Sequence, residues 1–422
     1  MSTGKVIEVT ICGGGNGTHA SAAVISRTKE FKVNVFTRRP KEWSKNLVGI
    51  TKGSSWESRG NYVANLNNIT NNPSEISTTD VWIISGPAHI HYGLLKSIAP
   101  YVKPGAFVGT LFAQGGFEWM CREVFGQRLS QLTMFGLFNI PFICKSDEYG
   151  KSVRIIGPKD QLLVAIEPAT RMTETVKLIE KMWTIPTVTL PNFLTLTLTP
   201  SNQIIHPARI YGVFQNWDGK TPYDPKSIPL FYEDMDEYSA HQLELLDSEI
   251  QLIKEGIMGK YPQYDLTYVL PLRQRIIKQY GKQVSDPTNM YTTFRTNQGY
   301  KTVRIPVKEV QGGVIPNIDG RIFWEDVPYG LMILRQIADF VGVHTPNINR
   351  MIRWHQQFMN KQYILPNDEL NQSLLAETGV PSRYGITNLD QLIGIQVTKQ
   401  QSANNNLIII VLLSSFKEKK NK

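Results

Sequence analysis

The chain has 422 residues, of which 41% are hydrophobic and 19% are charged, and its net charge is +9. This composition is typical of a globular protein and excludes a disordered one, and the length predicts two domains. Lysine and arginine are spread along the chain without a basic helix or a basic-aromatic repeat, so we expect attraction for small anions and no nucleic-acid binding.

Three cysteines with no CxxC spacing indicate a reducing compartment and neither a disulfide framework nor a metal site. Residues 1–5 lead directly into a predicted strand, which indicates no signal peptide and a cytoplasmic location. The apolar run 407–413 has seven residues, far fewer than the about 20 that a membrane-spanning helix needs. We therefore expect no membrane association.

An apolar run at 5–12 leads into four glycines within five positions. A sharp turn after a buried strand favours residues without a Cβ, and a helix of small residues follows from Thr18. Strand, glycine loop and helix together predict an α/β dinucleotide-binding fold, in which the helix N-terminus holds a pyrophosphate. The alternative is a turn that is glycine-rich for structural reasons. The residues expected to bind the cofactor here are Gly13, Gly15, Asn16 and Gly17.

The end of the second predicted strand, 31–36, is where such folds distinguish NAD from NADP. NAD-binding chains usually place an acidic residue there for the ribose hydroxyls, whereas this chain has Thr37, Arg38 and Arg39. The two arginines could hold a 2′-phosphate, stack on adenine or face water. These residues are therefore compatible with either NADH or NADPH as the cofactor.

Further strands are predicted at 80–85, 106–111, 132–137, 153–158, 162–165 and 187–197, and 48–78 is expected to be mostly irregular with one short strand. Ligands of doubly wound sheets lie beyond the carboxyl ends of the strands. That rule places Pro87, His89 and His91 beside the cofactor. Gln114 also ends a strand, either as a polar donor to a ligand or as a turn residue that satisfies local backbone.

After Pro200 strand signals become sparse, and apolar residues follow helical spacing at 203–214, 238–254, 266–280, 331–341 and 347–359. We therefore expect a dinucleotide-binding domain over 1–199 and a mainly helical domain over 200–396, with the site in the cleft between them. Residues 397–422 are expected to be a disordered tail or an artefact of sequence assembly.

Hydride transfer needs a proton donor or acceptor near the nicotinamide, and histidine suits this near neutral pH. His206 opens the helical domain, where it is either this residue or a structural histidine. Asp326 could orient it, or could cap the helix that begins near Pro328. Arg321 could bind a substrate carboxylate with two parallel hydrogen bonds, or could form a surface ion pair.

The chain resembles the opine dehydrogenases, most closely the octopine and tauropine dehydrogenases of marine invertebrates, from about residue 5 to Asp390. The motifs that carry the resemblance appear in chain order: Gly13–Gly17, Gln114–Glu118 before Cys121–Arg122, His206–Ala208 leading to Trp217–Lys220, and Glu325–Pro328.

The resemblance implies a Rossmann domain followed by a helical domain. It also implies condensation of an amino acid with a 2-oxo acid, usually pyruvate, and reduction of the resulting imine by NADH in a monomeric enzyme. By this resemblance His206 is the acid/base residue and Asp326 its orienting partner, while Arg321 and Gln114 bind substrate carboxylates.

One departure bears on the amino acid. Asn139 stands where octopine-type enzymes offer a carboxylate, and an enzyme that binds arginine should have an acid near the guanidinium. This favours a small amino acid such as taurine, glycine or alanine over arginine. The remaining alternatives are a 2-hydroxy-acid or glycerol-phosphate dehydrogenase on the same frame, and a nicotinamide-binding sensor without catalysis.

Overall fold

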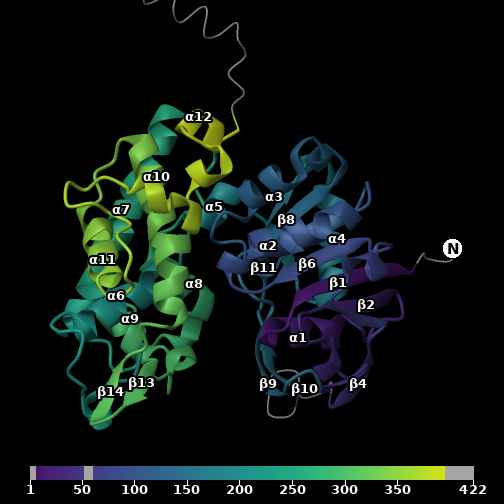
Figure 1. Cartoon of the computed structure of the whole chain (residues 1–422), viewed down its shortest axis with the longest axis horizontal. Helices are drawn as coiled ribbons and strands as arrows, with labels where there is room; N and C mark the ends of the chain where they lie inside the picture. The colour runs from purple at the N-terminus through teal and green to yellow at the C-terminus, as the bar shows by residue number, and fades with distance from the viewer. Residues whose placement is uncertain (1–5, 52–59, 395–422) are drawn as a thin grey trace, which may run out of the picture.

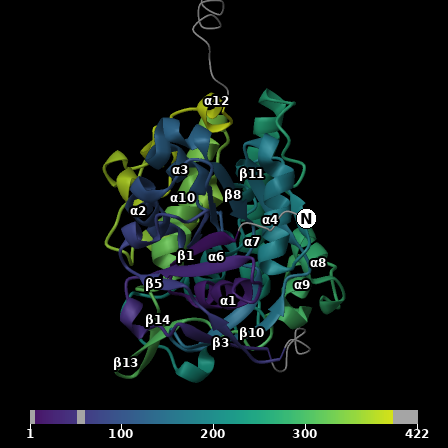
Figure 2. The ribbon, with the colours of Figure 1, turned by 90° about the vertical axis from the view of Figure 1, so that its right-hand side faces the viewer.

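The structure is a computed structural model that describes residues 6–51 and 60–394. The predicted tail, 397–422, lies outside the described residues. Figure 1 shows a part built around a parallel sheet, in purple and blue, beside a helical part in green and yellow. Seen from the side of the sheet in Figure 2, the helical part lies behind it.

The main sheet has eight strands in the order β12, β11, β8, β7, β6, β1, β2, β5. From β8 to β5 all neighbours are parallel, β11 is antiparallel to β8, and β12 is parallel to β11. The strands are β1 (Ile7–Gly13), β2 (Phe31–Phe36), β5 (Asn68–Thr70), β6 (Val81–Ser85), β7 (Phe107–Thr110), β8 (Thr133–Leu137), β11 (Leu162–Glu167) and β12 (Thr187–Thr189).

Helices cover both faces of this sheet: α1 (Asn16–Ile25), α2 (Ala88–Ile98), α3 (Phe117–Phe125) and α4 (Met172–Trp183). In β1, Val9 and Ile11 pack on the face of α1, and Cys12 packs on the face of α2 and α3. From Val9 to Cys12 β1 is buried on both faces, as parallel strands usually are. The predicted Rossmann-type fold is confirmed.

A second sheet lies against α1, with strands in the order β4, β3, β10, β9. They are β3 (Asn46–Ile50), β4 (Tyr62–Asn65), β9 (Phe142–Glu148) and β10 (Ser152–Pro158). The prediction of one short strand within 48–78 was wrong in number, because β3, β4 and β5 fall wholly or partly in it. Gly and Asn lower its local strand propensity, and β3 is held between two partners, the nearby β4 and β10 a hundred residues later.

The helical part contains α5 (Phe193–Thr197), α6 (Asn202–Phe214), α7 (Glu237–Lys260), α8 (Leu272–Tyr280), α9 (Met290–Thr296), a π-helix (Ile322–Leu331), α10 (Met332–Val341), α11 (Pro346–Gln356) and α12 (Leu389–Leu392). The predicted helices at 203–214, 238–254, 331–341 and 347–359 are present. The one expected at 266–280 begins later, after Pro271, and α9 was not predicted. A hairpin of β13 (Val307–Val310) and β14 (Gly313–Pro316) lies among the helices.

The strand predicted over 187–197 was wrong in its second half. β12 ends at Thr189, and Asn192 then begins α5 by accepting a hydrogen bond from the Thr195 amide at 2.8 Å. Alternating Leu and Thr imitate a half-exposed strand, but all five residues of α5 are buried, so the alternation does not reflect an exposed face. Within the described residues, no helix is long and apolar enough to span a membrane.

Candidate functional site

The glycine loop between β1 and α1 has the shape that a dinucleotide phosphate needs. Gly13 has φ +151°, and a Cβ there would lie 2.0 Å from the Ser85 carbonyl oxygen, so only glycine fits. A Cβ on Gly15 would meet no atom within 4 Å. Gly15 precedes α1 without a side-chain cap, and its open face leaves the helix amides accessible to an anion. The loop therefore fits a pyrophosphate.

Hydrogen bonds connect the glycine loop and the start of α1 with the second sheet. His19 Nδ1 donates to the Gly15 carbonyl at 2.8 Å, and its Nε2 accepts from the Gly150 amide at 2.7 Å. Burial is the main cause that lowers the His19 pKa, which suits a neutral ring. Asn16, predicted as a cofactor ligand, accepts from the Ser146 amide at 3.0 Å. Its side chain thus fixes the hairpin between β9 and β10 to the loop.

Thr37, Arg38 and Arg39 lie at the end of β2, beside the loop as predicted. Thr37 is buried, and its Oγ1 lies 3.3 Å from where a Cβ on Gly14 would be. Arg38 is exposed. The Arg39 guanidinium lies 3.7 Å from the ring centroid of Tyr149 and pairs with Glu42 at 3.1 Å. Sequence reasoning placed no acidic residue here, yet Glu42 supplies one from the following turn.

His206 and Asp326 lie 120 residues apart in the chain and meet in the structure. His206 Nδ1 lies 2.9 Å from Asp326 Oδ2, and both side chains are largely buried, with 22% and 8% exposed. His206 comes from α6 and Asp326 from the π-helix. Gly330 permits this close approach, because a Cβ there would lie 2.4 Å from the Cβ of Gln203 on α6. π-Helices are rare and often mark functional sites.

The other nitrogen of His206 faces Tyr232, whose hydroxyl lies 3.4 Å from Nε2. With Nδ1–H donated to Asp326, Nε2 is left as an acceptor, so the neutral imidazole is oriented as a base. Tyr232 stacks on Tyr300 with ring centroids 4.4 Å apart. Nothing in the sequence pattern singled out Tyr232, because it is one tyrosine in a segment without a motif.

One buried carboxylate connects the helical part with the cofactor edge of the sheet. Glu325, which is 4% exposed, accepts from the Ala88 amide at 2.8 Å and from Arg321 Nε at 2.6 Å. Ala88 begins α2 directly after Pro87, at the carboxyl end of β6. The pair of Asp326 and His206 is thereby placed next to the strand ends. The side chain of Arg321 is largely exposed and forms an ion pair with Glu325. An ion pair was the alternative to a role in binding a substrate carboxylate.

Gln114 is buried at the junction of the two parts, and its amide nitrogen donates to the Thr199 carbonyl at 2.8 Å. Arg275 also donates to that carbonyl, at 3.3 Å, and to the Pro200 carbonyl at 2.7 Å. The predicted carboxylate ligand Gln114 thus satisfies backbone here. Asn139 is half-buried just after β8, next to Ile140, whose side chain lies 3.6 Å from where a Cβ on Gly17 would be.

Buried histidines make stability depend on pH. Burial lowers the pKa of both His91 and His355 to about 4. The unfolded chain therefore binds more protons between pH 6.5 and about 4, so stability falls as the pH falls through this window. We expect His355→Phe to cost on the order of 1 kcal/mol at pH 7.5, because it removes one hydrogen bond to Met351.

Between pH 6.5 and 5 the same variant is expected to lose about 1 to 2 kcal/mol less than the unsubstituted protein. Urea unfolding at each pH, followed by circular dichroism, measures the difference. Equal losses in the two proteins would contradict the burial of a neutral His355. Carboxylates titrate alike in both proteins, so they cancel in the comparison.

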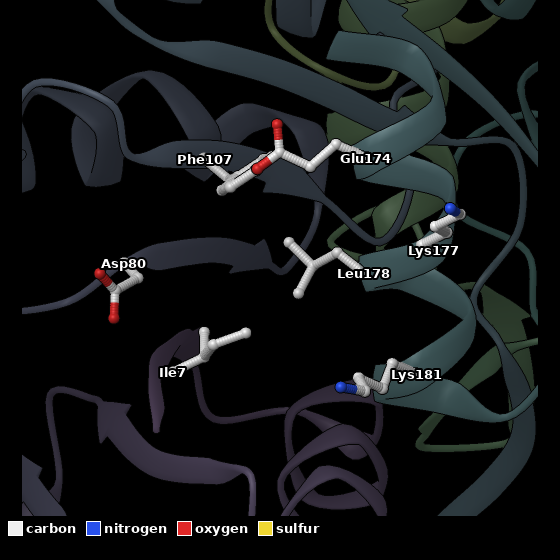
Figure 3. A pocket seen from close by; sticks show the side chains of 7 residues that line it. All are labelled: Ile7, Asp80, Phe107, Glu174, Lys177, Leu178 and Lys181. Carbon is white, nitrogen blue, oxygen red and sulfur yellow. The ribbon is translucent and has the colours of Figure 1, made fainter. Parts of the chain in front are cut away.

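A cavity of about 450 Å³ lies at the amino ends of the strands of the main sheet, on the side away from the glycine loop. Figure 3 shows Ile7, Asp80 and Phe107, at or just before the starts of β1, β6 and β7, facing Leu178 and Lys181 of α4. In a doubly wound sheet the ligand crevice lies at the carboxyl ends of the strands. This cavity is therefore separate from the candidate site. Over residues 6–51 and 60–394, no group of three or more His, Cys, Asp or Glu side chains could hold a metal ion.

A Rossmann-type domain with an open glycine loop, joined through a buried carboxylate to helices that carry a His–Asp pair, defines an NAD(P)-dependent oxidoreductase. Residues 189–359 match the family model of the NAD/NADP octopine/nopaline dehydrogenase α-helical domain. The tauropine dehydrogenase of Arabella iricolor is 30% identical, over 92% of this chain and 100% of the relative.

Two solved structures of octopine dehydrogenase are also similar. One, with NADH and L-arginine, has a TM-score of 0.83 and 28% identity. The other, with NADH and pyruvate, has a TM-score of 0.80 and 27% identity. Each comparison covers 93% of this chain and 99% of the other. The chain belongs to the opine dehydrogenase family.

Proposed function

We propose that this protein condenses pyruvate with an amino acid and reduces the imine with NADH, regenerating NAD in anaerobic glycolysis. The observation that carries the proposal is the contact of 2.9 Å between His206 of α6 and Asp326 of the π-helix, next to Glu325, which contacts the start of α2. Family membership and the octopine dehydrogenase structures with NADH, L-arginine and pyruvate support it.

Bound at the glycine loop, NADH supplies the hydride. Gly13 permits the tight turn after β1, Gly17 lets the start of α1 pack closely against Leu111 and Ser85, and the open amides near Gly15 would hold the pyrophosphate. His206 Nε2 accepts a proton from the substrate ammonium group, which frees the amine to attack the keto carbon. The imidazolium then returns a proton as the carbonyl oxygen leaves as water, and Asp326 stabilises that charged form.

The choice of amino acid rests on the neutral side chain of Asn139. Because it lies beyond β8 near the glycine loop and carries no charge for a guanidinium, we propose a small amine substrate such as taurine, glycine or alanine. We also propose the domain division at about residue 200, with Arg321 and Gln114 as substrate-carboxylate ligands once substrate displaces their present partners. The cytoplasmic location and the monomeric state stay predictions from the sequence.

A panel of amines tests the proposal directly. Oxidation of NADH is followed at 340 nm with pyruvate and one of arginine, taurine, glycine, alanine or β-alanine. We expect turnover that depends on the amine and is faster with a small one than with arginine. Pyruvate without amine is the control, and equal turnover in that control would indicate a 2-hydroxy-acid dehydrogenase. Absence of turnover with every amine would contradict the proposed function.

A further inference from the structure

The turn after β2 holds a pair of opposite charges whose purpose the proposed reaction does not explain. Arg39 Nη1 lies 3.1 Å from Glu42 Oε2, and the two side chains are about half exposed, at 55% and 50%. The pair belongs to the short 3₁₀ turn Pro40–Glu42, in which the Glu42 amide donates to the Arg39 carbonyl at 3.2 Å. Exposed pairs of this kind contribute little to stability, typically about 0 to 1 kcal/mol.

The pair lies beside the glycine loop. The Arg39 guanidinium lies 3.7 Å from the ring centroid of Tyr149, and the Tyr149 hydroxyl lies 2.6 Å from where a Cβ on Gly14 would be. Thr37 Oγ1 approaches the same point of Gly14 to 3.3 Å. In a dinucleotide-binding fold the end of the second strand lies at the adenosine ribose. Arg39 and Glu42 therefore stand where the 2′ substituent of the cofactor would be.

The charges at this position decide between the two cofactors. Arg39 alone would attract a 2′-phosphate, as arginines do in NADP-binding chains. Glu42 cancels that charge at 3.1 Å and adds a carboxylate that repels a phosphate dianion but tolerates a hydroxyl. Stacking on Tyr149 keeps the guanidinium beside Glu42. The Arg39–Glu42 pair is thus neutral, and the positive charges that remain in the segment 38–42 are those of Arg38 and Lys41.

We propose that Glu42 is the residue that selects NADH over NADPH, by neutralising Arg39 and repelling a 2′-phosphate. This inference rests on the proposed function only in requiring a nicotinamide dinucleotide at the glycine loop. Glu42 lies beyond the end of β2, three positions after Arg39, the residue whose charge it neutralises.

Binding titrations of the full chain with NADH and with NADPH, followed by nicotinamide fluorescence, test the inference without turnover. We expect the unsubstituted protein to bind NADH more tightly. Glu42→Gln is expected to lower the Kd for NADPH about tenfold, since one like charge is removed, and to change the Kd for NADH by less than twofold. Adding Arg39→Met to Glu42→Gln should abolish the gain.

The matched control is Glu174→Gln. Glu174 of α4 forms the same i, i+3 pair with Arg171, which directly precedes that helix, near the amino ends of the strands. It therefore tests the general loss of one surface charge. An unchanged ratio of the two dissociation constants in Glu42→Gln, or an equal gain in Glu174→Gln, would overturn the inference while leaving the proposed function intact. Failure of the unsubstituted protein to bind either dinucleotide would overturn both.

Discussion

Replacing His206 with asparagine is expected to lower kcat about 10²- to 10⁴-fold, the range that a positioned general acid or base contributes. Asparagine keeps a polar group near Asp326 but cannot accept and return a proton at neutral pH. The binding of NADH should stay within about threefold, because His206 lies on α6 and the glycine loop lies in the other part of the chain. Steady-state kinetics with pyruvate and the preferred amine, together with an NADH titration, measure both effects.

The companion variants are Asp326→Asn and the double variant. If Asp326 acts by orienting His206 across 2.9 Å, its loss should cost little once the imidazole is gone, so the double variant should resemble His206→Asn. Effects that multiply would show that Asp326 acts independently of His206. A His206→Asn protein with full activity would remove His206 from the reaction.

Two substitutions in the glycine loop are expected to have different effects, one on the stability of the fold and one on the binding of NADH. Gly13→Ala should destabilise the fold by about 2 to 4 kcal/mol, because the new Cβ would lie 2.0 Å from the Ser85 carbonyl oxygen at φ +151°. Thermal unfolding without cofactor measures this cost. An unchanged melting temperature would contradict the close approach of β1 to the end of β6.

Gly15→Ala is the contrasting variant. Its backbone has φ −86°, which suits alanine, and the added methyl meets no protein atom within 4 Å. Stability should therefore stay within about 0.5 kcal/mol, the usual range for surface substitutions. The methyl would instead occupy the open face of the loop, so the Kd for NADH should rise at least tenfold. Unchanged NADH binding in a stable Gly15→Ala protein would argue against a phosphate at this face.

Local patterns were enough to predict the glycine loop and the central strands of the main sheet, β1, β2, β6, β7 and β8. The alternation to Val and Ile before Gly13, and the small residues after Gly17, reflect requirements that act within one strand–turn–helix unit. The same reasoning failed at β3 and β4, because their pairing with each other and with the distant β10 stabilises segments of low local strand propensity. It also failed at α5, where burial rather than periodicity decides the structure.

The candidate site was predicted less from periodicity than from resemblance. Spacing alone left His206, Asp326 and Arg321 each with a structural alternative, and family motifs brought the first two together. Tyr232, Tyr149 and Glu42 were missed, because each acts through a partner far along the chain or through a turn without a motif. Glu325 was quoted only as part of a motif, yet its contact with Ala88 spans 237 residues.

The adjacency of Glu325 and Asp326 has a mechanical consequence. Neighbouring residues of a helix point in different directions, so one turn of the π-helix reaches α2 with the first carboxylate and His206 with the second. A shift that moved this turn away from α2 would move the Asp326 carboxylate in the same step. The orientation of His206 and the contact between the two parts of the molecule therefore depend on the same turn of the π-helix, and a change in one changes the other.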